Sequence, residues 1–249
     1  MDVCEITMIK VRKESMQRKF YRPFTLGLDI GGTGIKMMVV DSKGKSVTAL
    51  LRELTPHPAT VKAVCKIISK MLQSIDIKFN RVSAGFPGVV QQGIIKTAPN
   101  MDSSWIGINF EKKLATITQL PVKVINDAAL QGYGDIKGKG VELVITLGTG
   151  VGSALFLDGK LVPNVQLAHI PFRHDKTYEE LLGKAALKKY GLDKWNSNLK
   201  RAIQLWDQTF NYNKLYIGGG YAHKIKFALP SNAKTCKNLE GVLGSVKLW

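Results

Sequence analysis

One short pattern occurs twice in this chain, and the repetition constrains the fold more than any other feature. In the first copy, the β-rich run TLGLDI is followed by the glycine turn GGTG and the apolar run IKMMVVD. In the second copy, VELVITL is followed by GTG and by VGSALFLDGKLV. Runs of β-branched and apolar residues around a glycine turn predict paired strands. Two halves that begin alike predict an internal duplication, an α/β fold of two lobes with a cleft between them.

The rest of the chain alternates predicted strands and helices. SVTALLREL completes a three-stranded meander, and apolar residues at helical spacing predict an amphipathic helix in TVKAVCKIISKMLQSI. We then expect a strand in RVSAGFPGVV, a helix in NFEKKLATITQL, a strand in PVKVINDAA that runs into a helix, helices in YEELLGKAALKKYG and LKRAIQLWDQTFN, and a strand in KLYIGGG. The expected division is a basic extension (1–24), a first lobe (25–121), a second lobe (122–237) and a C-terminal helix (about 238–249) that packs back on the first lobe.

Composition limits the class of protein. A chain of 249 residues can bury a sizeable core, and no run approaches the ~18 apolar residues that a membrane span needs. The first twenty residues lack the apolar region of a secretory signal. Three widely spaced cysteines, Cys4, Cys65 and Cys236, match neither a disulfide framework nor a CxxC zinc pattern. We therefore expect a soluble, cytoplasmic protein.

The charge of the chain is strongly positive. The 36 Lys and Arg residues exceed the 19 Asp and Glu residues, which gives a formal net charge of +17. Such an excess attracts polyanions and speeds their encounter. The candidates are nucleic acid, an anionic membrane surface or an anionic polymer substrate, and the alternative is a solubility property without a specific partner.

Three glycine turns are the first candidates for chemistry. Glycines after a strand let backbone N–H groups approach a phosphate closely. Asp29, just before the first turn, is a candidate to hold Mg²⁺ or to orient its water. That turn matches neither the P-loop nor the dinucleotide pattern, and the alternative for each turn is a plain structural role. The candidates are Gly31, Gly32 and Thr33 in the first turn, Gly148, Thr149 and Gly150 in the second, and Gly219 and Gly220 in the third.

Asp127 is the candidate base. It follows the apolar strand PVKVI at the start of a predicted helix, where a carboxylate is well placed to take a proton from a substrate hydroxyl. The alternative role is that of a helix N-cap. Among the four histidines, no pair shows the spacing of a helical zinc site with a glutamate. His169 is the histidine we expect near the substrate, with a structural role as the alternative.

Taken together, these segments resemble the ROK sugar kinases of the actin/hexokinase-like ATPase superfamily, and in particular their polyphosphate-dependent glucokinases. The resemblance implies a two-lobed actin-like fold (ribonuclease H-like, duplicated), with a mixed sheet and helices on both faces in each lobe. It implies a kinase that phosphorylates the 6-hydroxyl of glucose or a related hexose with Mg²⁺ and polyphosphate or ATP, and it suggests a homodimer. The matching stretches run in order from about Leu26 to Trp249: LGLDIGGTGIK, SAGFPGVV, TAPNMDSSWIG, VINDAA, LGTGVGSALFLDGKLVPN, LAHIPFRHDKTYEELLGKAALKKYG, KWN and LYIGGGYA.

The resemblance also implies roles for single residues. Asp127 corresponds to the general base for the 6-hydroxyl, and Asp29 to a magnesium contact. Lys36 lies near the phosphoryl donor, or else is a surface residue of its strand. The implied sugar-site residues are Gly85, Pro87, Gly88, Asn100, Asn126, Gln166 and His169. The implied donor-site residues are Asp29, Gly31, Gly32, Thr33, Lys36, Gly148, Thr149 and Gly150, and the third glycine turn adds Gly219 and Gly220 as candidates from the sequence itself.

The sequence departs from the family pattern in two places. PFRHDKTYEELLG lacks the cysteines that form a zinc motif in many ROK members, so we expect no structural zinc. In the family motif E-x-G-H, the sugar-binding glutamate is replaced by Gln166 and the glycine by Ala168. Loss of a charge-assisted hydrogen bond weakens hexose binding by roughly 1–2 kcal/mol or changes the preferred sugar.

The positive charge of the chain bears on the choice of phosphoryl donor. A basic groove binds polyphosphate largely by counterion release, while a solvated helix face is the alternative for each basic residue. We expect no membrane partner and no specific nucleic acid; residues 1–24 are too few for the DNA-binding domain of a ROK repressor. A second alternative is a sugar- or polyphosphate-binding relative with weakened catalysis. The candidate groove residues are Arg173, Lys176, Lys184, Lys188, Lys189, Lys194, Lys200 and Arg201.

Overall fold

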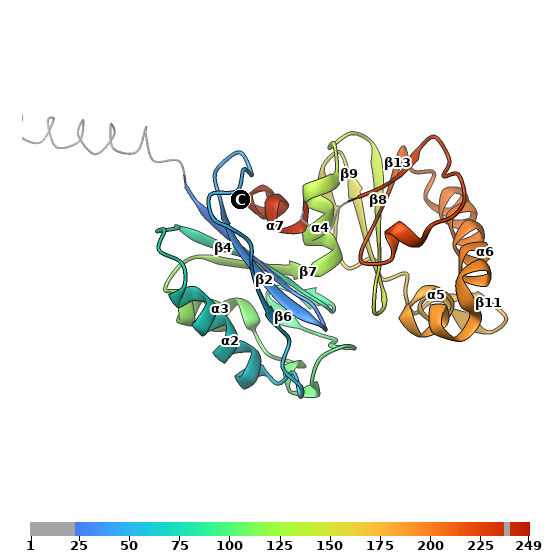
Figure 1. The fold of residues 1–249 in the computed structure, drawn as a ribbon. Helices are drawn as coiled ribbons and strands as arrows, with labels where there is room; N and C mark the ends of the chain where they lie inside the picture. Colours follow the sequence, from blue (N-terminus) through green and yellow to red (C-terminus); the bar gives the residue numbers. More distant parts are fainter. Residues whose placement is uncertain (1–22, 237–239) are drawn as a thin grey trace, which may run out of the picture.

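The computed structural model describes residues 23–236 and 240–249 and shows two lobes, each built on a five-stranded mixed sheet (Figure 1). The first sheet has the order β3 (Leu51–Leu54), β2 (Gly34–Val40), β1 (Thr25–Ile30), β4 (Arg81–Phe86) and β7 (Val122–Asn126). The second has the order β10 (Lys160–Val162), β9 (Val151–Leu157), β8 (Val141–Leu147), β13 (Lys214–Gly218) and β14 (Ala233–Thr235).

The two sheets share one topology. In each, three antiparallel strands are followed by two strands that pair in parallel. In the first sheet β1 pairs with β4 and β4 with β7, and in the second sheet β8 pairs with β13 and β13 with β14. The glycine turns join the first two strands of each meander. The α/β duplication predicted from these turns is therefore confirmed.

Helices cover both faces of each sheet (Figure 1). Helices α2 (Val61–Gln73) and α3 (Phe110–Thr118) cover the outer face of the first sheet, and α5 (Tyr178–Leu182) and α6 (Lys184–Phe210) cover the outer face of the second. Between the sheets lie α4 (Asp127–Asp135), α7 (Glu240–Leu243) and the 3₁₀ helix η3 (Gly244–Leu248). The smaller elements are β5 (Val90–Gln91), β6 (Ile94–Ile95), β11 (Pro171–Arg173), β12 (Lys176–Thr177), η1 (Ser103–Trp105) and η2 (Ala222–Lys224).

Helix α2 shows how the sequence pattern becomes packing. Its buried residues lie at helical spacing and join the core of the first lobe, and the Thr60 side chain caps its start by accepting from the N–H of Ala63. The predicted amphipathic helix is confirmed. The buried residues are Val61, Val64, Cys65, Ile68 and Met71.

Strand β7 differs from the expected lobe division. It pairs in parallel with β4, so it belongs to the first sheet, and the chain leaves that sheet after Asn126 rather than at residue 121. The apolar run PVKVI predicts a strand but carries no information about the sheet that the strand joins. That choice depends on long-range packing.

The helices after residue 177 also differ in their bounds. The expected helix YEELLGKAALKKYG is divided, because α5 ends at Leu182 and α6 starts at Lys184 after the N-cap Gly183. Helix α6 then bends at Gly191, whose φ of 76° only glycine adopts readily, and continues to Phe210. The short strand β14 had no clear sequence signal.

The C-terminal segment packs on the first sheet. Val242 joins Met38 and Val40 in a small apolar cluster, and the Ser83 hydroxyl donates to the carbonyl of Ser245. The segment is α-helical only over Glu240–Leu243, and residues 237–239, like residues 1–22 of the expected N-terminal extension, lie outside the described residues. Within the described part of the chain, no helix is long and apolar enough to cross a membrane.

Candidate active site between the lobes

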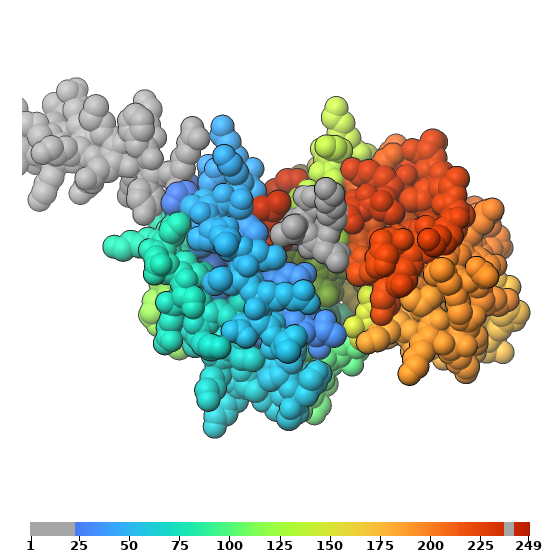
Figure 2. All heavy atoms as spheres, in the orientation of Figure 1, coloured from blue at the N-terminus to red at the C-terminus, as the bar shows by residue number. Residues whose placement is uncertain are grey.

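A cavity of about 560 Å³ lies between the lobes and draws its lining from both. The surface is hollowed between the blue-to-cyan first lobe and the orange-to-red second lobe (Figure 2). All but one of the site residues predicted from the sequence line this cavity. They are Asp29, Gly31, Gly32, Thr33, Lys36, Pro87, Gly88, Asn100, Asn126, Asp127, Gly148, Thr149, Gly150, Gln166, His169, Gly219 and Gly220.

Gly85 is the exception. It lies inside β4, where an added Cβ would be 3.1 Å from Cα of Asp127 and 3.0 Å from the Leu130 side chain. Its small size lets α4 approach the sheet, so its role is packing and not contact with a ligand. Only Pro87 and Gly88 of that expected turn reach the cavity.

The first glycine turn carries an ion pair beside it. The turn is closed by the N–H of Gly31, which donates to the carbonyl of Gly34 over 2.9 Å. Asp29 on β1 lies directly opposite Lys36 on β2, and Nζ of Lys36 is 3.0 Å from Oδ2 of Asp29. Both side chains are mostly buried at the cavity wall, so Lys36 is not a plain surface residue of its strand.

The second glycine turn is held by backbone contacts. The N–H of Gly148 donates to the carbonyl of Gly150 over 3.0 Å, and the N–H of Lys184 at the start of α6 donates to the carbonyls of Gly148 and Thr149. Around Gly148 there is open space, because an added Cβ would meet nothing within 4 Å. This turn can therefore receive a ligand close to its backbone.

The third glycine turn packs against the second strand–turn unit. Gly219 has a φ of 86°, and an added Cβ would lie 2.3 Å from the carbonyl oxygen of Leu147. Glycine is therefore required there by the fold itself. Gly220, in contrast, has open space around it and faces the cavity.

The junction of β7 and α4 answers whether Asp127 is a helix cap. Asn126 is the N-cap, since its Oδ1 accepts from the N–H groups of Ala128 and Ala129, and its Nδ2 donates to the carbonyl of Gly88. Asp127 is the first helical residue, and its Oδ1 accepts from the N–H of Ala128 over 2.8 Å. Asp127 is therefore not the N-cap, and its carboxylate, which bonds the Ala128 N–H through Oδ1, borders the cavity.

The environment of Asp127 raises its pKa to about 7. The main cause is burial: the side chain keeps some contact with solvent at the cavity wall, but the surrounding protein removes most of its hydration. The negative charge of Asp29 raises the pKa further, while the N–H of Ala128 and the charge of Lys36 act in the opposite direction. A carboxyl group with this pKa can accept a proton near neutral pH.

The cavity also contains side chains that the sequence analysis did not single out. Arg52 on β3, Gln131 on α4 and Glu179 on α5 all line it. Oε2 of Glu179 accepts from the N–H of Val151 just after the second glycine turn. Nε2 of Gln131 is buried and has no hydrogen-bond partner among the residues that the structure describes. Spacing identifies Gln131, which lies one helical turn after Asp127; Arg52 and Glu179 have no comparable local signal.

The basic groove expected from the sequence is mostly elsewhere. Of its eight residues, only Lys184 lines the cavity. Lys176 lies 3.9 Å from Glu180, and Lys189 lies over the ring of Tyr190. Successive residues of a helix point in different directions, so the adjacent Lys188 and Lys189 on α6 do not share one surface.

The comparisons with known proteins agree with this geometry. The ROK family model matches residues 25–169. The polyphosphate glucokinase of Mycobacterium leprae is 31% identical over 236 residues, which is 88% of this chain and 72% of that protein. An inorganic polyphosphate/ATP-glucomannokinase from Arthrobacter sp. strain KM superposes with a TM-score of 0.83 at 31% identity, covering 91% of this chain and 98% of that one.

A more distant structure shares the fold. The ROK family glucokinase from Streptomyces griseus, solved with glucose and AMPPNP, has a TM-score of 0.77 at 20% identity and covers 90% of this chain and 98% of its own. The fold, the cavity between two duplicated lobes and the family match lead to one conclusion: this chain belongs to the ROK family.

Proposed function

We propose that this chain is a hexose kinase that phosphorylates the 6-hydroxyl of glucose, with inorganic polyphosphate, ATP or both as the phosphoryl donor. The observation that carries the proposal is the position of Asp127, a carboxylate with a pKa of about 7 that borders the same cavity as both glycine turns. The relatives named polyphosphate glucokinase and polyphosphate/ATP-glucomannokinase support the choice of substrates.

The reaction needs one proton acceptor and a held donor. Asp127 accepts the proton of the sugar hydroxyl while the hydroxyl oxygen forms a bond to the terminal phosphorus. The bond from that phosphorus to its bridging oxygen breaks, and its electron pair leaves with the shortened donor. The amide N–H groups of the glycine turns and the Thr149 hydroxyl are available to the phosphate oxygens.

The sugar side of the cavity offers neutral polar groups. Asn100, Gln166 and His169 line it, and Asn126 keeps one N–H of its amide after capping α4 and contacting Gly88. An added Cβ on Gly32 would lie 3.1 Å from the Asn100 side chain, so the first glycine turn and the proposed sugar residues are in contact. This contact supports a site in which a sugar and a donor phosphate meet.

Magnesium fits this site in a limited way. Within residues 23–236 and 240–249, no three His, Cys, Asp or Glu side chains converge. Mg²⁺ is commonly held by one or two carboxylates together with phosphate oxygens and water, and Asp29 supplies one carboxylate at the cavity wall. When bound there, the ion neutralises charge on the donor phosphates, and Lys36 holds the carboxylate in position.

Substitution of Asp127 tests the proposal. Asp127→Asn keeps the acceptor for the Ala128 N–H but removes the base, so kcat for glucose 6-phosphate formation falls about 10²–10⁴-fold with either donor. Asp76→Asn, an exposed carboxylate outside the cavity, is the matched control and keeps full activity. A fully active, folded Asp127→Asn enzyme contradicts the proposal.

Gln166 decides between an efficient kinase and a weakened sugar binder. Gln166→Glu restores a charged acceptor for the sugar hydroxyls, and the KM for glucose falls roughly tenfold. Glucose binding by calorimetry without transfer from any donor supports the weakened binder instead. The homodimer and the cytoplasmic location stay predictions.

A further inference from the structure

Three side chains form a row across the first three strands of the first sheet. In the strand register, Asp29 on β1 is opposite Lys36 on β2, and Lys36 is opposite Arg52 on β3. Residues directly opposite each other project from the same face of a sheet. All three side chains line the cavity, in the order acid, base, base.

Of the two cations in this row, one has an ion-pair partner and the other does not, among the described residues. Lys36 is paired with Asp29 at 3.0 Å. Arg52 is exposed, and among the described residues no carboxylate lies within ion-pair distance of its guanidinium. Arg52 therefore presents an unneutralised cation at the mouth of the cavity.

Arg52 lies against the first glycine turn. An added Cβ on Gly34 would be 3.4 Å from Nε and 3.7 Å from an Nη atom of Arg52. Two strand spacings, roughly 10 Å, separate β3 from β1. The part of the site beside Asp29 and the guanidinium of Arg52 would therefore contact different phosphate groups of one linear donor.

The second lobe places a matching cation on the other side. Lys184 is the first residue of α6, its backbone N–H is fixed to the second glycine turn, and its exposed side chain lines the cavity. Within the described part of the chain, Lys184 also has no carboxylate partner in ion-pair range. Each glycine turn thus has one unpaired cation beside it, one from each lobe.

We propose that Arg52 and Lys184 form a clamp that binds the phosphates of a linear donor behind the transferred phosphate, one cation from each lobe. The proposal rests on the proposed kinase function. An arginine fork and a lysine ammonium both bind phosphate oxygens. Polyphosphate continues its charge to the mouth of the cavity, where ATP has an uncharged nucleoside, so the clamp favours polyphosphate over ATP.

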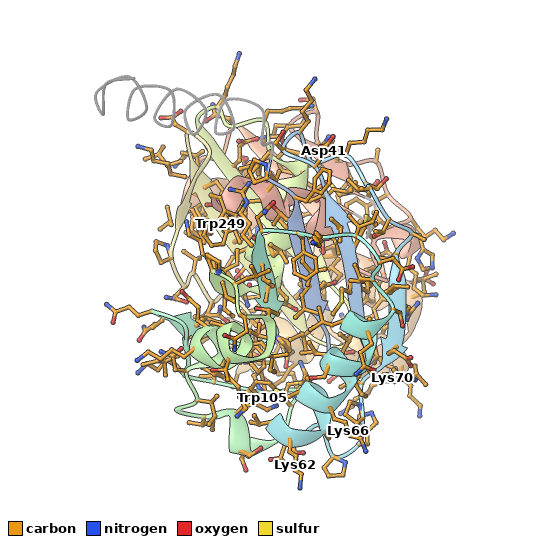
Figure 3. All side chains as sticks on the ribbon, turned by 90° about the vertical axis from the view of Figure 1, so that its left-hand side faces the viewer. Asp41, Lys62, Lys66, Lys70, Trp105 and Trp249 are labelled. Atoms are coloured by element: carbon orange, nitrogen blue, oxygen red, sulfur yellow. The ribbon has the colours of Figure 1, made fainter. Side chains whose placement is uncertain are left out.

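The test compares Arg52→Gln, Lys184→Gln and the double variant. Because both side chains are exposed, the variants keep the fold. We expect the KM for long-chain polyphosphate to rise about tenfold for each single variant, while the KM for ATP and for glucose changes less than about threefold. Lys62→Gln and Lys160→Gln are matched controls, one in each lobe: they remove the same charge from exposed positions outside the cavity, with Lys62 on the solvent side of α2 (Figure 3).

Direct binding separates this proposal from the kinase function. The Kd for long-chain polyphosphate is measured without glucose at several salt concentrations. Each clamp variant should lower the slope of log Kd against log salt by about 0.7, and each control should lower that slope less. Equal losses in clamp and control variants would show a net-charge effect and overturn the clamp. Equal losses of affinity for polyphosphate and for ATP in the clamp variants would overturn the position of the clamp behind the transferred phosphate. A wild-type protein that transfers no phosphate overturns the kinase function, while the binding result still decides the clamp.

Discussion

The first and second glycine turns have similar backbone structures but differ in the charged side chains beside them. Each joins antiparallel strands and is closed by a hydrogen bond of about 3 Å. At the second-to-last strand pair before the turn, the first lobe has Asp29 and Lys36, whereas the second lobe has Thr146 and Gly152. The duplication thus kept the strand–turn–strand backbone in both lobes and placed the paired charges at this position in only one.

This difference predicts the largest effect. Asp29→Asn removes the carboxylate proposed to position Mg²⁺ and leaves Lys36 unpaired, so kcat falls about 10²–10³-fold. Thr146→Val, the equivalent position in the second lobe, lowers kcat by less than about fivefold. Steady-state rates at saturating Mg²⁺ make the comparison, and equal losses at the two positions would mean that the lobes share the charged chemistry.

The pH dependence sharpens the same comparison. Because Asp127 must be ionised to accept a proton and its pKa is about 7, kcat/KM falls about tenfold for each pH unit below 7. Asp29→Asn removes a charge that raises the Asp127 pKa, so the acid limb moves to lower pH. Lys36→Met removes a charge that lowers it, so the limb moves to higher pH. A limb that stays at the same pH in both variants would assign it to another group.

Stability gives an independent check of that pKa. The Asp127 pKa is raised above its ordinary value of 3.8, so the folded protein binds the proton more tightly than the unfolded chain does. The stability that this group contributes is fully present below pH 3.8 and is lost as the pH rises to about 7. Asp127→Asn should therefore melt at the same temperature as the wild type near pH 3.8, if both are folded there, and at a higher temperature at pH 8.

Alanine substitutions in the second and third glycine turns distinguish an effect on donor binding from an effect on stability. Gly148→Ala has space for its methyl group, so the fold is kept, and the KM for the donor rises about five- to tenfold as the methyl group blocks the turn. Gly219→Ala has no such space and also needs a positive φ, so the protein loses roughly 2–4 kcal/mol of stability. Donor kinetics and thermal melts of both variants measure this. A destabilised Gly148→Ala would contradict the open turn.

The smallest effect on activity is expected at the C-terminus. The indole N–H of Trp249 donates to the Ser83 hydroxyl over 2.9 Å, and its ring lies under Lys123 and Arg81, at the edge of the first lobe and away from α2 (Figure 3). Trp249→Ala should cost about 1–2 kcal/mol and lower Tm by a few degrees, with kcat within twofold. A large loss of kcat would show that this contact positions the site.

Local patterns predicted most of this fold and site. Strand alternation, helical spacing and glycine turns identified both meanders and α2, and the ordered motifs identified the cavity residues. The two errors, on β7 and Gly85, and the omission of Arg52 concern features that depend on long-range pairing. The sheet joined by β7, the packing role of Gly85 and the position of Arg52 beside Lys36 all follow from which strands lie side by side.

The junction of β7 and α4 has a mechanical consequence. The chain leaves the first sheet at Asn126, and α4 then packs against strands of both lobes. Asp127, as the first residue of α4, is thereby anchored to both sheets at once. A substitution that loosens this helix would loosen the hold of both lobes on a single carboxylate.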